Sequence, residues 1–120
     1  MRILITGGNS MVAKHLKQIL PPGYDNIYVD RQRCDLTDLN KVRWLISSYE
    51  PDHVIHLAAR VGGIQDNIKR PADYFDDNVL MNTNIIKVCY EYDIQRFTGI
   101  LSTCIYPDKL DHYPMIEEDM

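Results

Sequence analysis

The first thirteen residues constrain the fold of this chain more than any other stretch. They read Met-Arg-Ile-Leu-Ile-Thr-Gly-Gly-Asn-Ser-Met-Val-Ala. The apolar run at residues 3–5 is typical of a strand that is buried on both faces of a parallel sheet. Two glycines break the strand, and residues 9–10 can cap a helix that continues to Pro21. A strand, a tight turn and a helix N-terminus place unpaired amides at one point, which predicts an anion site suited to a pyrophosphate.

The glycine spacing matches the dinucleotide-binding fingerprint in part. In the Thr-Gly-x-x-Gly-x-x-Gly pattern of extended short-chain dehydrogenases, Gly7 holds the first place, whereas Ser10 and Ala13 stand at the second and third glycine positions. Ala13 still permits close packing of the helix on the strand, and the Ser10 side chain either crowds a pyrophosphate or hydrogen-bonds to it. The alternative is a strand, turn and helix that bind no ligand.

The length and charge of the chain exclude several classes of protein. With 120 residues it forms one domain at most, and a net charge of −4 without a basic patch argues against a nucleic-acid partner. No apolar run is long enough to span a membrane. The first strand begins at Arg2 and leaves no room for a signal peptide, so we expect a cytoplasmic protein. Its three cysteines, an odd number without metal-type spacing, are then free thiols.

The rest of the chain alternates strands with helices. We expect strands at residues 26–29, 53–57 and 97–101, a short extended segment that ends at residues 34–38, and helices at residues 38–49 and 72–92. Thr37 can cap the first of these helices, and Pro71 can open the second. The alternation predicts an α/β protein with a Rossmann-type open parallel sheet in the strand order 3-2-1-4-5 and with helices on both faces.

The end of the second strand carries two conflicting signals for the cofactor. Asp30 suits the ribose hydroxyls of NAD, whereas Arg31 and Arg33 suit the 2′-phosphate of NADP. The alternative for all three residues is a solvated loop.

The helix at residues 72–92 combines an apolar side with three asparagines. The expected apolar positions are Phe75, Val79, Ile85, Ile86, Val88 and Cys89. Asparagine is a poor helix former, so we expect some of Asn78, Asn82 and Asn84 to serve as hydrogen-bonding groups and at least one to be exposed without consequence.

Small and polar residues follow two strands at the edge where open parallel sheets bind ligands. Residues 58–63, Ala-Ala-Arg-Val-Gly-Gly, let a ligand approach the backbone, and residues 102–104 place two hydroxyls and a thiol at the same edge. His53 and His56 lie three apart on a strand and point to opposite faces, which argues against a metal site there.

Four stretches together resemble one family. They are residues 1–8, residues 54–63, Asn78 with residues 84–86, and residues 102–107, Ser-Thr-Cys-Ile-Tyr-Pro. They resemble the N-terminal part of the GDP-L-fucose synthase family, extended short-chain dehydrogenase/reductases that act as NADPH-dependent GDP-4-keto-6-deoxy-mannose 3,5-epimerase-4-reductases. The resemblance implies that residues 1–120 are an N-terminal NAD(P)-binding domain without the substrate domain, with NADP(H) favoured over NAD(H) and GDP-4-keto-6-deoxy-mannose as the substrate of the whole enzyme.

The resemblance also implies roles for single residues. The cofactor-binding residues would be Gly7, Asn9, Ser10, Met11 and Val12 at the pyrophosphate, Arg31 and Arg33 at the 2′-phosphate, Asp35 and Leu36 at the adenine, and Leu57, Ala58, Ala59, Arg60 and Leu101 further along. Ser102 resembles the catalytic serine that hydrogen-bonds the C4 oxygen during hydride transfer, and Cys104 resembles the acid/base cysteine of epimerisation. A thiol suits proton removal next to a ketone because its pKa, about 8.5, falls near positive charge. The alternative for Cys104 is a small buried apolar residue.

The Tyr-x-x-x-Lys pair of the family does not occur in these 120 residues. We therefore expect the chain to be inactive alone and the parent protein to be the enzyme. Two alternatives are a nucleotide- or partner-binding module without turnover, and an NAD-dependent nucleotide-sugar epimerase or dehydratase, which Asp30 would suit. A sheet that lacks its last strand and helices exposes an edge and an apolar face, so we expect a homo-oligomer.

Overall fold

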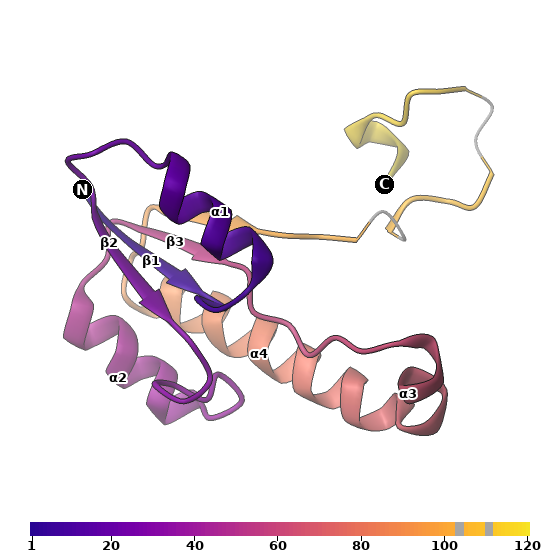
Figure 1. The fold of residues 1–120 in the computed structure, drawn as a ribbon, viewed down its shortest axis with the longest axis horizontal. Helices are drawn as coiled ribbons and strands as arrows, with labels where there is room; N and C mark the ends of the chain where they lie inside the picture. The colour runs from indigo at the N-terminus through magenta and orange to yellow at the C-terminus, as the bar shows by residue number, and fades with distance from the viewer. Residues whose placement is uncertain (103–104, 110–111) are drawn as a thin grey trace.

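A computed structural model of the protein describes residues 1–102, 105–109 and 112–120. Its centre is a parallel sheet of four strands in the order β2-β1-β3-β4 (Figure 1). The strands are β1 (Arg2–Thr6), β2 (Asp25–Val29), β3 (His53–His56) and β4 (Arg96–Gly99). The structure confirms the predicted fold class, a Rossmann-type open sheet with the first strand in an interior position.

The expected order 3-2-1-4-5 counts one strand, ending at residues 34–38, that this described segment does not form. Residues 34–38 form turns, because Asp35 Oδ1 accepts hydrogen bonds from the Thr37 amide at 3.1 Å and from its hydroxyl at 2.8 Å. A carboxylate that caps the backbone two residues on favours a turn over an extended strand. The four remaining strands keep the predicted order.

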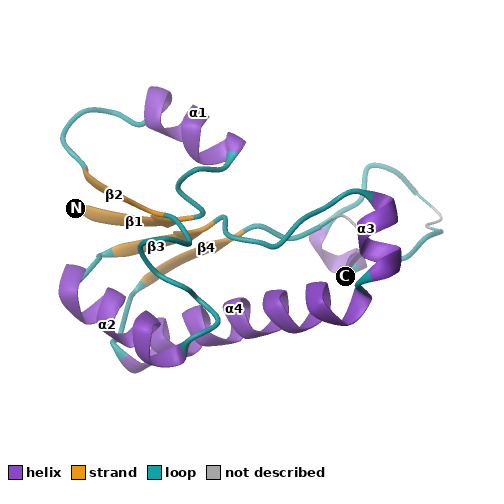
Figure 2. Cartoon of the chain, turned by 60° about the horizontal axis from the view of Figure 1, so that its bottom comes forward, coloured by secondary structure: helices purple, strands orange, loops and turns teal. Residues whose placement is uncertain are grey.

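Helices cover both faces of the sheet (Figure 2). Helix α1 (Met11–Ile19) lies on one face, and α2 (Leu39–Tyr49) and α4 (Pro71–Glu91) lie on the other. Asp38 caps α2 by accepting hydrogen bonds from the amides of Asn40 and Lys41, so the predicted cap at Thr37 is wrong. The short helix α3 (Ile64–Lys69) was not predicted, and Gly63 precedes it without a side-chain cap.

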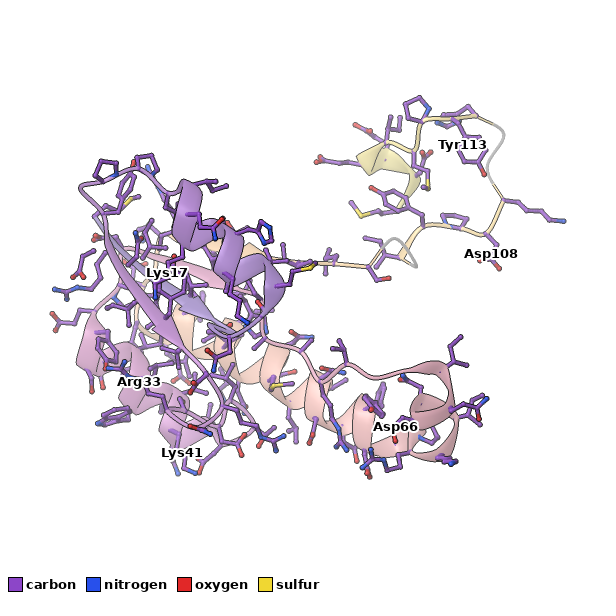
Figure 3. The ribbon with its side chains drawn as sticks, viewed as in Figure 1. Lys17, Arg33, Lys41, Asp66, Asp108 and Tyr113 are labelled. Carbon is purple, nitrogen blue, oxygen red and sulfur yellow. The ribbon has the colours of Figure 1, made fainter. Side chains whose placement is uncertain are left out.

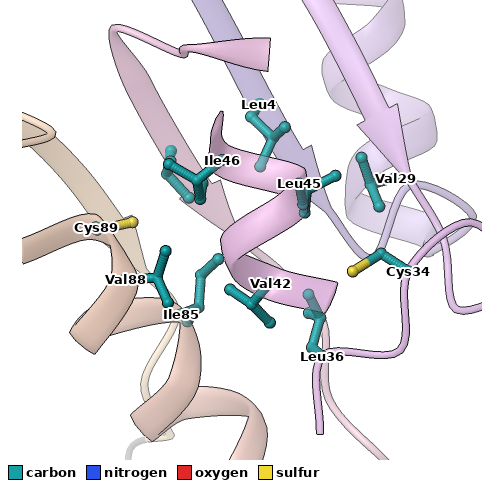
Figure 4. Close-up of a cluster of buried hydrophobic side chains, with 11 residues drawn as sticks. Leu4, Val29, Cys34, Leu36, Val42, Leu45, Ile46, Ile85, Val88 and Cys89 are labelled. Carbon is teal, nitrogen blue, oxygen red and sulfur yellow. The ribbon is translucent and has the colours of Figure 1, made fainter. Parts of the chain in front are cut away.

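Most of the core lies between the sheet and the pair α2 and α4 (Figure 4). The buried side chains there are Leu4, Val29, Cys34, Leu36, Val42, Leu45, Ile46, Val54, Ile85, Val88 and Cys89. A smaller cluster of Ile3, Ile5 and Ala13 lies on the α1 face. The apolar side of α4 is narrower than predicted, because Phe75, Val79 and Ile86 are exposed.

Beyond Gly99 the chain leaves the sheet and extends away from it to a 3₁₀ turn at Glu117–Asp119 (Figure 1). β4 thus ends two residues earlier than expected. Of the helices in the described residues, none combines the length and the apolarity that crossing a membrane requires.

Candidate cofactor site

A cavity of about 440 Å³ lies where the carboxyl ends of β1, β2 and β3 meet. The segments that follow these three strands line it, together with Asp77 and Met81 of α4. It collects most of the residues predicted to bind a cofactor, namely Gly7, Asn9, Ser10, Arg31, Asp35, Leu36, Leu57, Ala58, Ala59 and Arg60. The site prediction missed Val29, Gln32, Cys34, Thr37, Val61, Asp77 and Met81. The strand ends could have indicated the first five, whereas the two from α4 depend on tertiary packing.

The turn after β1 lies against the segment after β3. Gly7 has a φ of +67°, and a Cβ atom there would lie 2.8 Å from the backbone nitrogen of Ala58 and from the carbonyl carbon and oxygen of Leu57. Only glycine meets both the left-handed conformation and this close approach. Position 7 therefore fixes the distance between two walls of the cavity.

The N-terminus of α1 opens onto the same cavity through Ser10. Its Oγ accepts a hydrogen bond from the Ala13 amide at 3.1 Å, so this side chain caps the helix. The amides of Met11 and Val12 have no acceptor within the helix and can serve an anion. The side chains of Met11 and Val12 are exposed and are not among the lining residues.

The turn after β2 brings one of its two predicted arginines to the cavity. Asp30 accepts hydrogen bonds from the Asn9 side chain at 2.7 Å and from the Arg33 amide at 3.0 Å. Arg31 lines the cavity. The guanidinium of Arg33 lies beside α2, 5.1 Å from the centre of the Tyr49 ring, and hydrogen-bonds the Tyr49 hydroxyl (Figure 3). The structure therefore does not bring Arg33 to the lining.

Asp35 is the second acidic residue, after Asp30, that lines this side of the cavity. Hydrogen bonds from Thr37 lower its pKa, and the nearby charge of Arg31 lowers the pKa further. Asp35 is therefore ionised at neutral pH, and its oxygens serve as acceptors.

Arg60, on the wall that follows β3, is held by α4. Its guanidinium lies 2.9 Å from an Asp77 oxygen and 3.6 Å from an Asp73 oxygen, and 4.8 Å from the centre of the Tyr74 ring. Two carboxylates offset the charge of this arginine, so Arg60 adds little positive potential to the cavity.

A buried chain of hydrogen bonds runs beneath the cavity. The Ala58 amide donates to Thr6 Oγ1 at 3.4 Å, Thr6 Oγ1 lies 2.7 Å from His56 Nδ1, and His56 Nε2 lies 2.9 Å from Asn82 Oδ1. The Asn82 oxygen can only accept, so His56 carries its proton on Nε2 and Nδ1 accepts from the Thr6 hydroxyl. Burial lowers the pKa of His56, and the hydrogen bond to Asn82 opposes this effect in part.

We expect the stability of the protein to fall as the pH drops from 6.5 towards 5, because the folded state binds a proton at His56 less readily than the unfolded chain. The stabilisation is complete above the unfolded-state pKa of about 6.5 and is lost as the pH falls through the lower folded-state pKa. Urea unfolding at pH 7.5, 6.5 and 5.5 measures it. His56→Gln should flatten this acid dependence more than His53→Gln, a change at a less buried histidine. An unchanged dependence in His56→Gln would contradict the assignment.

The structure describes two of the predicted site residues that follow β4, and neither lines the cavity. Leu101 and Ser102 follow the end of β4, are exposed, and are not among the described residues that line the cavity. Cys104 lies outside the described residues. The physical reason is the register of the sheet: Gly99, the last residue of β4, pairs with His56, whereas the lining on the β3 side begins at Leu57.

Comparisons with known proteins agree with this geometry. The family model described as "NAD dependent epimerase/dehydratase family" matches residues 3–120. GDP-L-fucose synthase of Dictyostelium discoideum is 36% identical over 119 residues, which make up 96% of this chain and 37% of that protein. GDP-L-colitose synthase of Yersinia pseudotuberculosis is 30% identical over 112 residues, 92% of this chain and 36% of that protein.

A solved structure extends the likeness to three dimensions. The crystal structure of a GDP-L-fucose synthetase from Naegleria fowleri bound to NADP has a TM-score of 0.85 and 35% identity, covering 98% of this chain and 38% of that one. The chain thus spans a little over a third of the length of these relatives, and the resemblance to the N-terminal part of GDP-L-fucose synthases is confirmed. Since the family model matches the chain from residue 3 to residue 120, this protein belongs to the NAD dependent epimerase/dehydratase family.

Proposed function

We propose that residues 1–120 are an N-terminal domain that binds NADP(H). The observation that carries this proposal is the shared cavity of the Gly7 turn, the N-terminus of α1 and the Arg31 turn. A helix N-terminus suits the pyrophosphate, and an arginine beside it suits a 2′-phosphate. The NADP held by the Naegleria fowleri relative supports the same choice.

The proposal for the whole protein is an NADPH-dependent epimerase/reductase that makes GDP-L-fucose from GDP-4-keto-6-deoxy-mannose in the cytoplasm as a homo-oligomer. Its support is the 36% identity to the GDP-L-fucose synthase of Dictyostelium discoideum over nearly the entire chain. In this proposal Ser102 donates a hydrogen bond to the substrate oxygen where negative charge develops, and Cys104 exchanges the proton during epimerisation.

The second candidate is an NAD-dependent nucleotide-sugar enzyme, which the position of Asp30 in the cavity lining favours. Both Asp30 oxygens already accept hydrogen bonds, one from Asn9 and one from the Arg33 amide. These bonds hold the turn that carries Arg31, so we assign Asp30 to the folding of this turn and prefer NADP(H).

Arg31→Ala is expected to weaken NADPH binding by roughly tenfold and to change NADH binding by less than about twofold, because the lost contact is a charged hydrogen bond to the 2′-phosphate. Calorimetric titration with each nucleotide measures both affinities. Arg33→Ala is the matched control: it removes the same charge two residues away, from a side chain that lies on the Tyr49 ring.

Three results would contradict the proposal. Equal losses in the two arginine variants would point to a general charge effect. A preference of the unaltered protein for NADH would favour the second candidate, and binding of neither nucleotide would favour a module without cofactor.

A further inference from the structure

We propose that Asn78, Asn82 and Asn84 of α4 are positioning residues that fix the walls of the cofactor cavity at three points, an inference that rests on the proposed NADP(H) function. The sequence predicted that at least one of them would be exposed without consequence. The structure instead gives each asparagine a hydrogen-bond partner in a segment after a strand or in the strand end below it.

Asn84 holds the wall that follows β2. It is 7% exposed, and its Nδ2 donates to the carbonyl oxygens of Leu36 and Thr37, both at 3.0 Å. Leu36 and Thr37 line the cavity. The side-chain amide of Asn84 thus provides hydrogen bonds to two backbone carbonyls of this turn, which a neighbouring strand would provide in a sheet.

Asn78 holds the wall that follows β3. Its Oδ1 accepts from the Arg60 amide at 2.8 Å, and its Nδ2 donates to the Arg60 carbonyl at 3.0 Å. The same Nδ2 lies 2.8 Å from the Tyr74 carbonyl within α4. The backbone of Arg60 is therefore paired with α4 as it would be with a neighbouring strand.

Asn82 acts through His56. Its Oδ1 accepts a hydrogen bond from His56 Nε2, which leaves His56 Nδ1 free to accept from the Thr6 hydroxyl. The Thr6 oxygen in turn accepts a hydrogen bond from the Ala58 amide. The wall that follows β3 is thereby linked to α4 at a second point, Ala58, through the side chains of His56 and Thr6.

One rigid element carries all three groups. Helix α4 has 21 residues, and Ile85, Val88 and Cys89 anchor it in the core. Asparagine disfavours a helix interior, so propensity does not explain three of them at these positions. Their common effect is to attach the turn after β2 and the segment after β3 to the same helix, which keeps these two walls at a fixed spacing for a ligand.

The same substitution tested at each position separates the three roles. Asn84→Asp replaces the amide that donates to both carbonyls by a carboxylate, so NADPH affinity should fall by at least about tenfold. Asn82→Asp keeps an acceptor for His56, so the loss of affinity at pH 7.5 should be smaller than in Asn84→Asp, while the His56 pKa rises beside a negative charge. Asn78→Asp keeps one of its bonds to Arg60 and should give an intermediate loss.

Thr83→Asp is the matched control, since it adds the same charge to the same helix at an exposed position. NADPH affinity is measured by calorimetry at a temperature where circular dichroism shows each variant folded, and the His56 pKa by NMR titration. A purely structural role would lower the melting temperature of Asn84→Asp and leave the affinity for NADPH unchanged, which would overturn the proposal. Equal losses in all four variants would also overturn it, because added charge would then be the cause.

Failure of the proposed function is recognised separately, since the unaltered protein would then bind no NADPH. In that case hydrogen exchange at the Arg60 amide still tests the inference. Exchange that is unchanged in Asn78→Ala would contradict a fixed wall.

Discussion

Gly7→Ala is expected to destabilise the protein by about 2–5 kcal/mol and to abolish NADPH binding. The added methyl group would lie 2.8 Å from backbone atoms of Leu57 and Ala58, and its residue would keep a φ of +67°. Backbone atoms cannot rotate away as a side chain can, so the segment after β3 has to move. Urea unfolding measures the loss of stability, and calorimetric titration measures the loss of NADPH binding.

Gly23→Ala separates the effect of backbone strain at a positive φ from the effect of the close approach to backbone atoms. Gly23 has a φ of +105°, but a Cβ atom there would meet no heavy atom within 4 Å. Backbone strain alone should cost about 1–2 kcal/mol and leave the affinity for NADPH unchanged. If both variants lost equal stability and both bound NADPH, the close approach of Gly7 to Ala58 would not matter for the site.

Thr6→Val is the second change with a large expected effect. It preserves the shape of a side chain that is 0% exposed and removes its hydroxyl. His56 Nδ1 and the Ala58 amide then lose their partner in a buried environment, which should cost about 2–4 kcal/mol. Chemical denaturation at pH 7.5 measures this cost.

Thr6→Ser supplies the comparison for that experiment. It retains the hydroxyl and deletes one methyl group, with an expected cost of about 1 kcal/mol. A Thr6→Ser variant as unstable as Thr6→Val would show that the methyl group, and not the hydrogen-bonded chain, carries the stability of this position.

The features that the sequence predicted correctly depend on local patterns. The apolar run at residues 3–5, the glycine turn and the alternation of strands and helices each act over a few residues, and they were enough for the fold class and for most of the cavity. The three asparagines were noticed because they disfavour a helix. Their partners could not be predicted, since each lies between 18 and 48 residues away along the chain.

The features that the sequence did not predict depend on competition between partners. Arg33 was expected at a phosphate, but the ring of Tyr49 offers it a neighbour sixteen residues on. Asp38 replaces Thr37 as the cap of α2, because the side chain of Thr37 already bonds to Asp35. Arg33 and Thr37 are residue types that can bind a phosphate and cap a helix, respectively, but in the folded chain their side chains hydrogen-bond to other partners.

The order of the sheet has a consequence for how the chain folds during synthesis. β1 is made first and lies between β2 and β3, with Arg2 paired to Asp25 and Ile3 paired to His53. An apolar strand must therefore remain uncovered on one side until about fifty further residues have left the ribosome, and closing that long loop costs entropy before any contact compensates it. We expect the nascent chain to expose Ile3, Leu4 and Ile5 to chaperones over this interval, and to fold in one step only after β3 has been made.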